Sequence, residues 1–232
     1  MRGYWRASLS PAYNFFLALV LLVGYEGILR LSSTPTSQRN LVEVWLTRLV
    51  GWASPYEWVL SVVIALLGVV YVYFIRREST RLTDWVFGLM ILEATAWAAA
   101  LYKLLPWLTR ALFPPPAQLN PFAPAFWESV ALCMGAGFYE ELFFRLLLVE
   151  GLLYLSTGLR PRKATAFHYL VIWTLSAMLF SAAHFLYEEP TSYAFWYRFL
   201  FGLFMSGLYL LRGFGIAAWS HAIYDMAVLW WR

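Results

Sequence analysis

The chain has 232 residues, of which 62% are hydrophobic and only 13% are charged. Soluble domains carry about 25% charged residues, so this composition excludes a disordered chain, a nucleic-acid-binding arm and almost any soluble globular domain. The net charge of +4 is better explained by the cytoplasmic loops of a membrane protein than by binding to nucleic acid. The many Trp and Tyr side chains suit the membrane–water boundary. We therefore expect an all-α, polytopic membrane protein that binds no nucleic acid.

Apolar runs of about 20 residues mark the membrane-spanning helices. In the first half of the chain we expect spans at residues 12–31, 58–75 and 85–105, the last of them ended by Pro106. Residues 41–52 form a short amphipathic segment, which is typical of a helix that lies at the membrane interface. A proline-rich loop then separates this half from the second.

The second half begins with a long apolar stretch, for which we expect a helix from residue 124 to about 155. Further spans are expected at 167–186, 193–211 and 214–231. The bundle therefore has seven transmembrane helices, or eight if the long helix breaks or the interfacial segment inserts.

Lysine and arginine are distributed unequally between the two sides of such a bundle. With seven spans, the side that holds the N-terminus carries nine of these residues outside the spans, and the opposite side carries five. Cytoplasmic loops are enriched in positive charge, so we expect a cytoplasmic N-terminus in a bacterial inner membrane.

Nine ionisable side chains are embedded in apolar sequence, where a charge costs roughly 2.5–3.5 kcal/mol to insert and usually faces a partner or a cavity. They are Glu26, Glu93, Glu128, Glu140, Glu141, Arg145, His184, His221 and Asp225. Seven of them lie between residues 128 and 225, which predicts one polar site in the C-terminal half. We expect Glu26 and Glu93, which lie outside this group, to pack against polar partners or near the end of a span.

Residues 135–145 hold the densest group of these charges. The small residues at 135–137 predict the close approach of another helix. Glu141 and Arg145 are four residues apart, so they share a helix face and can pair. Glu140 points roughly 100° away from that pair, which leaves it available as a general base. A buried ion-pair network that joins helices explains the segment equally well.

Two histidines follow on later helices. His184 lies near the end of an apolar span, where a hydrogen-bonded core histidine is the more frequent explanation. His221 and Asp225 are four residues apart and share one helical face, so they can bind a metal, stabilise an oxyanion or simply pair with each other. Two histidines and a spare carboxylate can activate water with or without a metal. The single cysteine, Cys133, lies in an apolar stretch and is expected to act as a small hydrophobe.

Together, three motifs resemble the CPBP family of intramembrane proteases, also called the CAAX-protease or Abi family, which includes the type II CAAX prenyl endopeptidases. The family pattern is E-E-x-x-x-R, then F-x-x-x-H, then H-x-x-x-N/D on successive membrane helices. Here the motifs are Glu140-Glu141…Arg145, Phe180…His184 and His221…Asp225, and residues 198–202 resemble a glycine-bearing helix between the last two. The resemblance divides the chain into N-terminal helices at 1–119 and a CPBP-like catalytic core at 120–232.

The resemblance implies a role for each motif residue. Glu140 is the general base that activates water, and His184 holds and polarises that water. His221 and Asp225 face the scissile carbonyl and stabilise the oxyanion. An ionised Asp225 cannot donate a hydrogen bond to an oxyanion, so it is either protonated or orients His221.

Supporting roles and cofactors are implied in the same way. Glu141 and Arg145 fix the helix and tune Glu140. The resemblance favours a glutamate-type, metal-independent mechanism without a cofactor. A zinc mechanism stays open, with Glu140, His184 and His221 as ligands.

The implied substrate is a membrane-associated protein or peptide that enters from the lipid bilayer and is cut near its tail. Prenylated tails, sorting tails and peptide precursors are equally compatible with the sequence. Two other functions also remain open: a non-proteolytic CPBP-like peptide-binding, immunity or scaffold protein, and a proton-coupled transporter. Glu26 and Glu93 are the best support for the transporter.

Overall fold

The computed structural model describes residues 2–32, 39–51, 57–75, 82–113, 126–160, 163–186 and 188–230. Every regular element in these ranges is a helix, which confirms the all-α class. Four of the described helices are long and apolar enough to cross a membrane: α2 (Pro11–Leu31), α5 (Asp84–Leu112), α8 (Ala166–His184) and α9 (Ser192–Arg212). A shorter apolar helix covers Trp58–Phe74 within α4 (Glu57–Ile75). The expected apolar spans at these positions are therefore helices.

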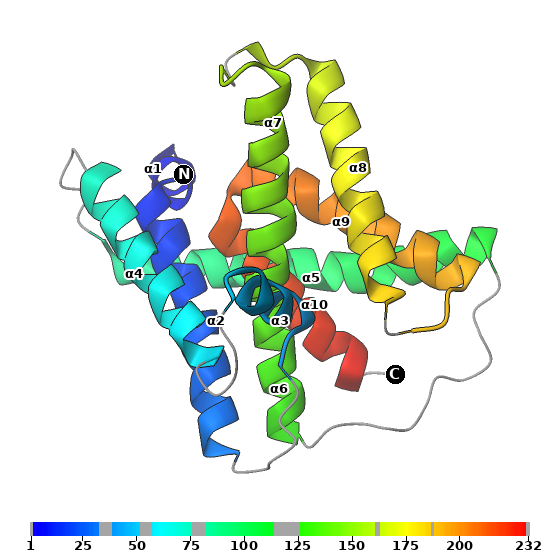
Figure 1. Cartoon of the computed structure of the whole chain (residues 1–232), viewed down its shortest axis with the longest axis horizontal. Coiled ribbons are helices and arrows are strands. Elements are labelled where there is room, and N and C mark those ends of the chain that lie inside the picture. The colour runs from blue at the N-terminus through cyan, green and yellow to red at the C-terminus, as the bar shows by residue number, and fades with distance from the viewer. Residues whose placement is uncertain are drawn as a thin grey trace.

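The long helix expected after the proline-rich loop is a single rod built from four consecutive elements, which stands upright in Figure 1. These are α6 (Phe126–Gly135), η1 (Ala136–Glu140), η2 (Leu142–Val149) and α7 (Glu150–Ser156). The two middle elements are π-helical. Because π-helical turns are rare and are frequent at functional sites, this winding marks the segment that carries Glu140 and Arg145. The expected residues 124 and 125 lie outside the described residues.

The predicted end of a helix at Pro106 is wrong, because α5 continues to Leu112. Proline removes one backbone hydrogen bond and clashes with the preceding turn, at a cost of about 3 kcal/mol. Here the face formed by Leu101, Leu105 and Thr109 is buried on both sides of the proline. Continued burial of that face offsets the local cost, and the helix persists.

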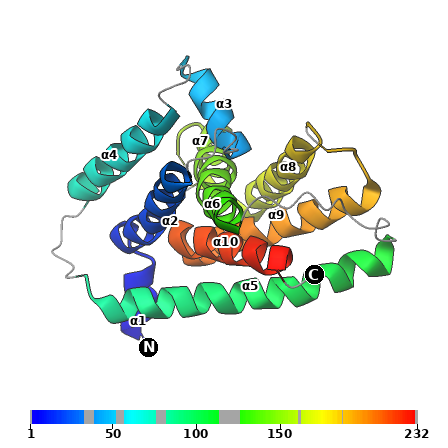
Figure 2. The ribbon, with the colours of Figure 1, turned by 90° about the horizontal axis from the view of Figure 1, so that it is seen from below.

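The last helix, α10 (Phe214–Trp230), lies in the centre of the molecule. It packs against α5, α2, α6, α9 and η1. Figure 2 shows α5 running beneath α10 and α9, with α2 and α6 on the other side of α10. A residue on α10 can therefore meet groups from both halves of the chain.

Close approach between α10 and the rod depends on Gly137. A Cβ atom at this position would overlap the backbone oxygen of Ala218 and would lie 2.8 Å from Cβ of Ala222. Only glycine permits that separation. The prediction that small residues before the two glutamates admit another helix is confirmed, and the helix is α10.

Two short helices complete the described fold. The first, α1 (Arg2–Ser8), packs on α5, and no helix was expected there. The second, α3 (Leu41–Leu49), lies within the expected amphipathic segment 41–52. It packs against α4 and η1, and its Glu43 is completely buried. The polar side of α3 thus includes residues that face protein.

Candidate active site

Glu140 and Glu141 lie next to each other in the π-helical part of the rod. The side chain of Glu141 is completely buried, whereas that of Glu140 keeps 11% of its surface exposed. The two carboxylates bond to different groups, as the sequence predicted. This divergence gives one carboxylate a structural partner and leaves the other without a charged partner within hydrogen-bond distance among the described residues.

Glu141 connects Arg145 to His221. Arg145 Nη1 lies 3.2 Å from Glu141 Oε1, which confirms the predicted pair. The same oxygen lies 2.7 Å from His221 Nδ1, a contact between two helices that was not predicted. An ionised carboxylate only accepts, so Nδ1 carries a proton and donates it to this bond. The ring is thereby oriented with Nε2 on its far side.

His221 Nε2 faces the two remaining acids. It lies 3.4 Å from Asp225 Oδ2, which confirms the expected proximity of these residues, and 3.9 Å from Glu140 Oε2. The side chain of Asp225 is 32% exposed, so this is the most open edge of the cluster. The imidazole therefore has three carboxylates within 4 Å, and Nε2 is the ring nitrogen that lies within this distance of Glu140 and Asp225.

Glu140 has a partner that the motifs do not contain. Its Oε1 accepts a hydrogen bond of 3.0 Å from Asn40 Nδ2, across 100 positions of the sequence. Its Oε2 lies beyond hydrogen-bond distance of His221. The carboxylate is therefore held on one oxygen and retains acceptor capacity on the other.

Phe180 brings His184 to the same region. Its ring centroid lies 4.9 Å from that of His184 and 6.1 Å from that of His221, and the guanidinium carbon of Arg145 lies 4.7 Å from it. His184 Nδ1 lies 2.9 Å from the Phe180 carbonyl oxygen. Because a carbonyl only accepts, Nδ1–H donates to it, and a neutral ring then presents Nε2 as an acceptor. The described contacts connect His184 to the cluster through Phe180.

Glu26 and Glu93 have polar partners elsewhere in the bundle, as expected. Glu26 accepts hydrogen bonds from Arg39 and Ser61. Glu93 forms a two-point ion pair with Arg212. Both carboxylates are thus used in contacts between helices that do not include Glu140.

The described residues contain no group of three or more His, Cys, Asp or Glu side chains arranged to hold a metal ion. Glu140, His184 and His221 are therefore not a preformed zinc site in this conformation, and zinc dependence stays a prediction. Cys133 is a buried free thiol, in the apolar setting expected for it.

Asn40 was not among the predicted site residues, although the sequence holds a signal for its position. Asn40 followed three residues later by Glu43 is typical of the beginning of a helix, and Asn40 is the N-cap of α3. That signal predicts a helix start. It does not predict that the amide reaches Glu140, because that contact depends on how α3 packs against η1.

An all-helical chain with several candidate membrane spans and a buried carboxylate–imidazole cluster is an integral, multi-pass membrane protein. Residues 122–227 match the family described as type II CAAX prenyl endopeptidase, Rce1-like, and this segment is a domain of that family. The match contains all three motifs and confirms the resemblance. No curated protein and no solved structure matches the chain.

Proposed function

We propose that the protein is an intramembrane endopeptidase in which Glu140 activates the attacking water. The observation that carries the proposal is the state of the Glu140 carboxylate. It is buried, it is held on Oε1 by a neutral donor, and its Oε2 faces His221 Nε2 at 3.9 Å. A carboxylate with spare acceptor capacity in a poorly solvated site can take a proton from water. The protease family of residues 122–227 supports the same reaction.

The proposed reaction is hydrolysis of one peptide bond. Glu140 accepts a proton from water while the water oxygen attacks the carbonyl carbon. The resulting tetrahedral species carries its negative charge on the former carbonyl oxygen. Glu140 then returns the proton to the departing amide nitrogen, the C–N bond breaks, and a carboxylic acid and an amine are released.

The histidines fit supporting roles in this reaction. His184 Nε2 is available to hold a water proton because Nδ1 is bonded to the Phe180 carbonyl. His221 Nε2, when protonated, can donate to the oxyanion. Asp225 Oδ2 lies 3.4 Å from that nitrogen, which favours orientation of His221 over direct donation to the oxyanion. Glu141 and Arg145 hold His221 from the other side.

The membrane setting completes the proposal. We infer seven or eight spans with a cytoplasmic N-terminus in a bacterial inner membrane, with helices at 1–119 supporting a catalytic core at 120–232. The substrate is the tail of a membrane-associated protein or peptide that reaches the site from the lipid. Composition supports this placement, since 62% of the residues are hydrophobic.

The test is cleavage by purified full-length protein in lipid vesicles. The probes are a farnesylated peptide that ends in Cys-aliphatic-aliphatic-X and an unprenylated apolar tail peptide, each with a fluorophore and quencher. We expect cleavage of at least one probe by the wild type, and Glu140→Gln to lower kcat by a factor of about 10² to 10⁴. Glu150→Gln is the matched control, since Glu150 is on the same rod and bonds to Tyr209 instead of the site.

Each outcome has a defined meaning. A Glu140→Gln variant that cleaves at the wild-type rate overturns the role of Glu140. Failure to cleave any probe, with a physiological phenotype that survives Glu140→Gln, favours a non-proteolytic peptide-binding protein. A chelator that abolishes cleavage, with recovery on addition of Zn²⁺, replaces the metal-free mechanism by the zinc alternative.

A further inference from the structure

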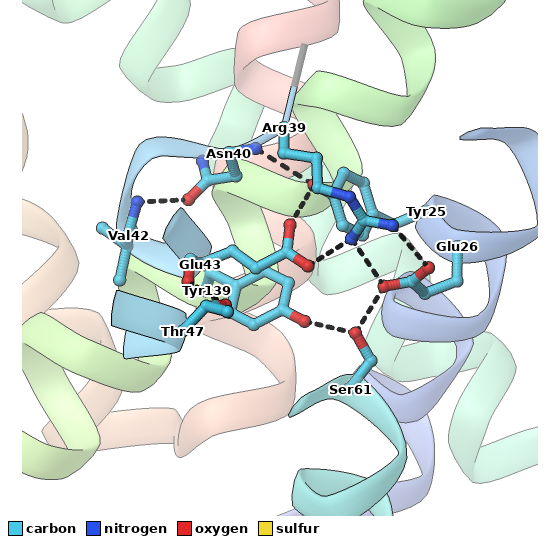
Figure 3. Close-up of polar contacts among 9 residues, drawn as sticks. All are labelled: Tyr25, Glu26, Arg39, Asn40, Val42, Glu43, Thr47, Ser61 and Tyr139. Carbon is cyan, nitrogen blue, oxygen red and sulfur yellow. Dashed lines mark hydrogen bonds and ion pairs between the residues drawn. The ribbon is translucent and has the colours of Figure 1, made fainter. Parts of the chain in front are cut away.

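A polar cluster lies beside Glu140, and we call it the α3 cluster (Figure 3). It connects α2, α3 and α4 to η1. Its members are Tyr25, Glu26, Arg39, Asn40, Glu43, Ser61 and Tyr139. All of them except Tyr139 lie outside the matched segment 122–227, so the family domain does not contain them.

The amide of Asn40 makes two bonds of opposite kind. Its Oδ1 accepts a bond of 2.9 Å from the backbone N–H of Val42, as an N-cap does, and its Nδ2 donates to Glu140 at 3.0 Å. A backbone N–H only donates and an ionised carboxylate only accepts, so both bonds require the same orientation of the amide. Asn40 is 6% exposed, which leaves little competition from solvent.

The start of α3 is itself held in place by groups on α2. The backbone N–H of Asn40 donates to the Tyr25 hydroxyl at 3.0 Å, and that hydroxyl donates to Glu43. Figure 3 shows the Arg39 guanidinium between Glu43 and Glu26, and it pairs with both. The position of Asn40 is therefore determined by contacts independent of Glu140.

The residue before Glu140 is held from the same side. The hydroxyl of Tyr139 lies 2.6 Å from Ser61 Oγ on α4, and Tyr139 is completely buried. The rod is thus connected to α3 at Glu140 and to α4 at Tyr139. These two contacts limit rotation of η1 about its own axis.

We propose that Asn40 is a positioning residue of the active site, which fixes Glu140 Oε1 so that Oε2 faces His221 and the attacking water. This inference rests on the proposed function, in which Glu140 is the base. A neutral amide suits the task because it aligns the carboxylate without the full positive charge that would neutralise a base. The active site is then shared between both halves of the chain, and α3 is part of it.

The proposal predicts a change in the pH profile of cleavage when Asn40 is replaced. The hydrogen bond that Asn40 donates stabilises the carboxylate form in which Glu140 can accept a proton from water. Titratable and charged groups surround Glu140, either in contact with it or in contact with its partners His221 and Asn40 and the cluster around them. They are His221 and Asp225 on α10, Tyr25 and Glu26 on α2, Arg39 and Glu43 at the start of α3, and Tyr139, Glu141 and Arg145 on the rod. Substitution of Asn40 by a serine changes none of these charges.

The experiment compares Asn40→Ser and Asn40→Asp with the wild type, using the full-length protein in lipid vesicles. Both replacements can still cap α3, but neither offers a neutral N–H donor to Glu140. Thr47→Val is the matched control, because Thr47 is buried on the same helix and its hydroxyl bonds to the carbonyl of Glu43. Thermal unfolding of each variant shows whether α3 and the bundle remain folded.

Two readouts are measured against pH: cleavage of the probe peptide, and infrared absorption by the carboxylic C=O that is lost in Glu140→Gln. For Asn40→Ser we expect both midpoints to rise and kcat to fall about tenfold, with KM changed less than about twofold. Asn40→Asp gives a larger change, because its carboxylate repels that of Glu140. Thr47→Val leaves both midpoints at the wild-type values.

The inference and the proposed function fail in different ways. Midpoints for folded Asn40→Ser and Asn40→Asp that equal the wild-type value overturn the positioning role. Absence of cleavage by the wild type overturns the function, while the infrared titration still reports whether Asn40 acts on Glu140. A KM that rises with kcat unchanged would assign Asn40 to substrate binding instead.

Discussion

Two embedded glutamates, Glu93 and Glu140, have similar exposure and different surroundings. The side chain of Glu93 keeps 18% of its surface exposed and that of Glu140 keeps 11%, so burial does not distinguish them. Glu93 accepts four hydrogen bonds among the described residues, two from Arg212 and one each from Tyr4 and Trp97. Glu140 accepts one within the same described part of the chain, from Asn40.

Remaining acceptor capacity therefore indicates function better than burial does. The oxygens of Glu93 are each engaged by Arg212 and by a second donor, so the carboxylate ties α1, α5 and α9 together. Glu140 has one oxygen fixed and one directed at a histidine beyond hydrogen-bond distance. Glu140 can therefore accept a proton from water, whereas both oxygens of Glu93 are already occupied. Because its oxygens are occupied, Glu93 is poorly suited to a proton relay.

Removal of Arg212 should have the largest effect on stability. Arg212→Met leaves Glu93 charged and deprived of its main partner, and breaking such a buried pair costs about 3–5 kcal/mol of unfolding free energy. Addition of Glu93→Gln to the same chain should restore most of the loss, because no unpaired charge remains. Denaturant unfolding in detergent, followed by circular dichroism, measures both variants.

Cleavage by the folded fraction completes that experiment. We expect the rate per folded molecule to stay at the wild-type value in the Arg212→Met and Glu93→Gln variants, because neither residue contacts Glu140. A double variant as unstable as Arg212→Met alone would show that Arg212 acts through packing against Trp5, over which its guanidinium lies at 3.8 Å, and not through the ion pair.

Gly137→Ala, three residues before Glu140, should have the next largest effect on stability. The added Cβ would overlap the Ala218 carbonyl oxygen, so α10 must move away from η1. Overpacking of this kind costs about 1–3 kcal/mol, and the movement separates His221 from Glu141, so we expect cleavage to fall as well. Thermal unfolding and the probe assay measure the two losses.

Gly151→Ala is the matched control on the same rod. Nothing lies within 4 Å of a Cβ built at Gly151, and alanine favours a helix over glycine by roughly 0.5–1 kcal/mol. This variant should be slightly more stable than the wild type and equally active. Equal losses for Gly137→Ala and Gly151→Ala would contradict the close approach of α10.

Substitutions of Asp225 should have a smaller effect, on kcat alone, and they test whether this residue orients His221. If Asp225 orients His221, the amide oxygen introduced by Asp225→Asn can still accept from Nε2, and we expect kcat within about threefold of the wild type. Asp225→Ala removes that acceptor and should lower kcat about tenfold, in line with the loss of one hydrogen bond to a charged ring. Because Asp225 is partly exposed, neither change should move the unfolding midpoint. Loss of all cleavage in Asp225→Asn would mean that the negative charge itself is required.

Sequence spacing predicted the contacts made within one helix, and the structure added those made between helices. Glu141 with Arg145 and His221 with Asp225 are four residues apart, so helical geometry alone brings them together. The bonds from His221 to Glu141 and from Asn40 to Glu140 join positions 80 and 100 residues apart.

These longer contacts depend on which helix faces pack together. Gly137 indicated that some helix comes close, but its sequence neighbourhood does not identify α10. The wrong prediction that a helix ends at Pro106 has the same origin. The local cost of a proline inside a helix predicted an end there, but burial of one face of α5 against other helices outweighs that cost.

The last prediction concerns Glu43, a member of the α3 cluster that lies beside Glu140. Burial raises the pKa of Glu43 from 4.5 to about 7, although the hydrogen bond from Tyr25 and the charge of Arg39 lower it. The Glu43 carboxyl therefore binds its proton more tightly in the folded state than in the unfolded state. Protonation of Glu43 stabilises the fold fully below about pH 4.5, and this stabilisation is lost as pH rises through about 7. Docking of α3 should therefore weaken between about pH 5 and about pH 8.

Hydrogen exchange of the α3 amides measures this docking when wild type and Glu43→Gln are compared at the same pH. Glutamine resembles the protonated acid, and Arg39 keeps Glu26 as a partner. The two proteins should exchange alike near pH 5, and wild-type α3 should exchange faster than Glu43→Gln near pH 8. Identical exchange at both pH values would mean that Glu43 stays ionised beside Arg39 throughout. In that case α3 would hold Asn40 against Glu140 independently of pH, and any acid limb of cleavage would belong to the active site alone.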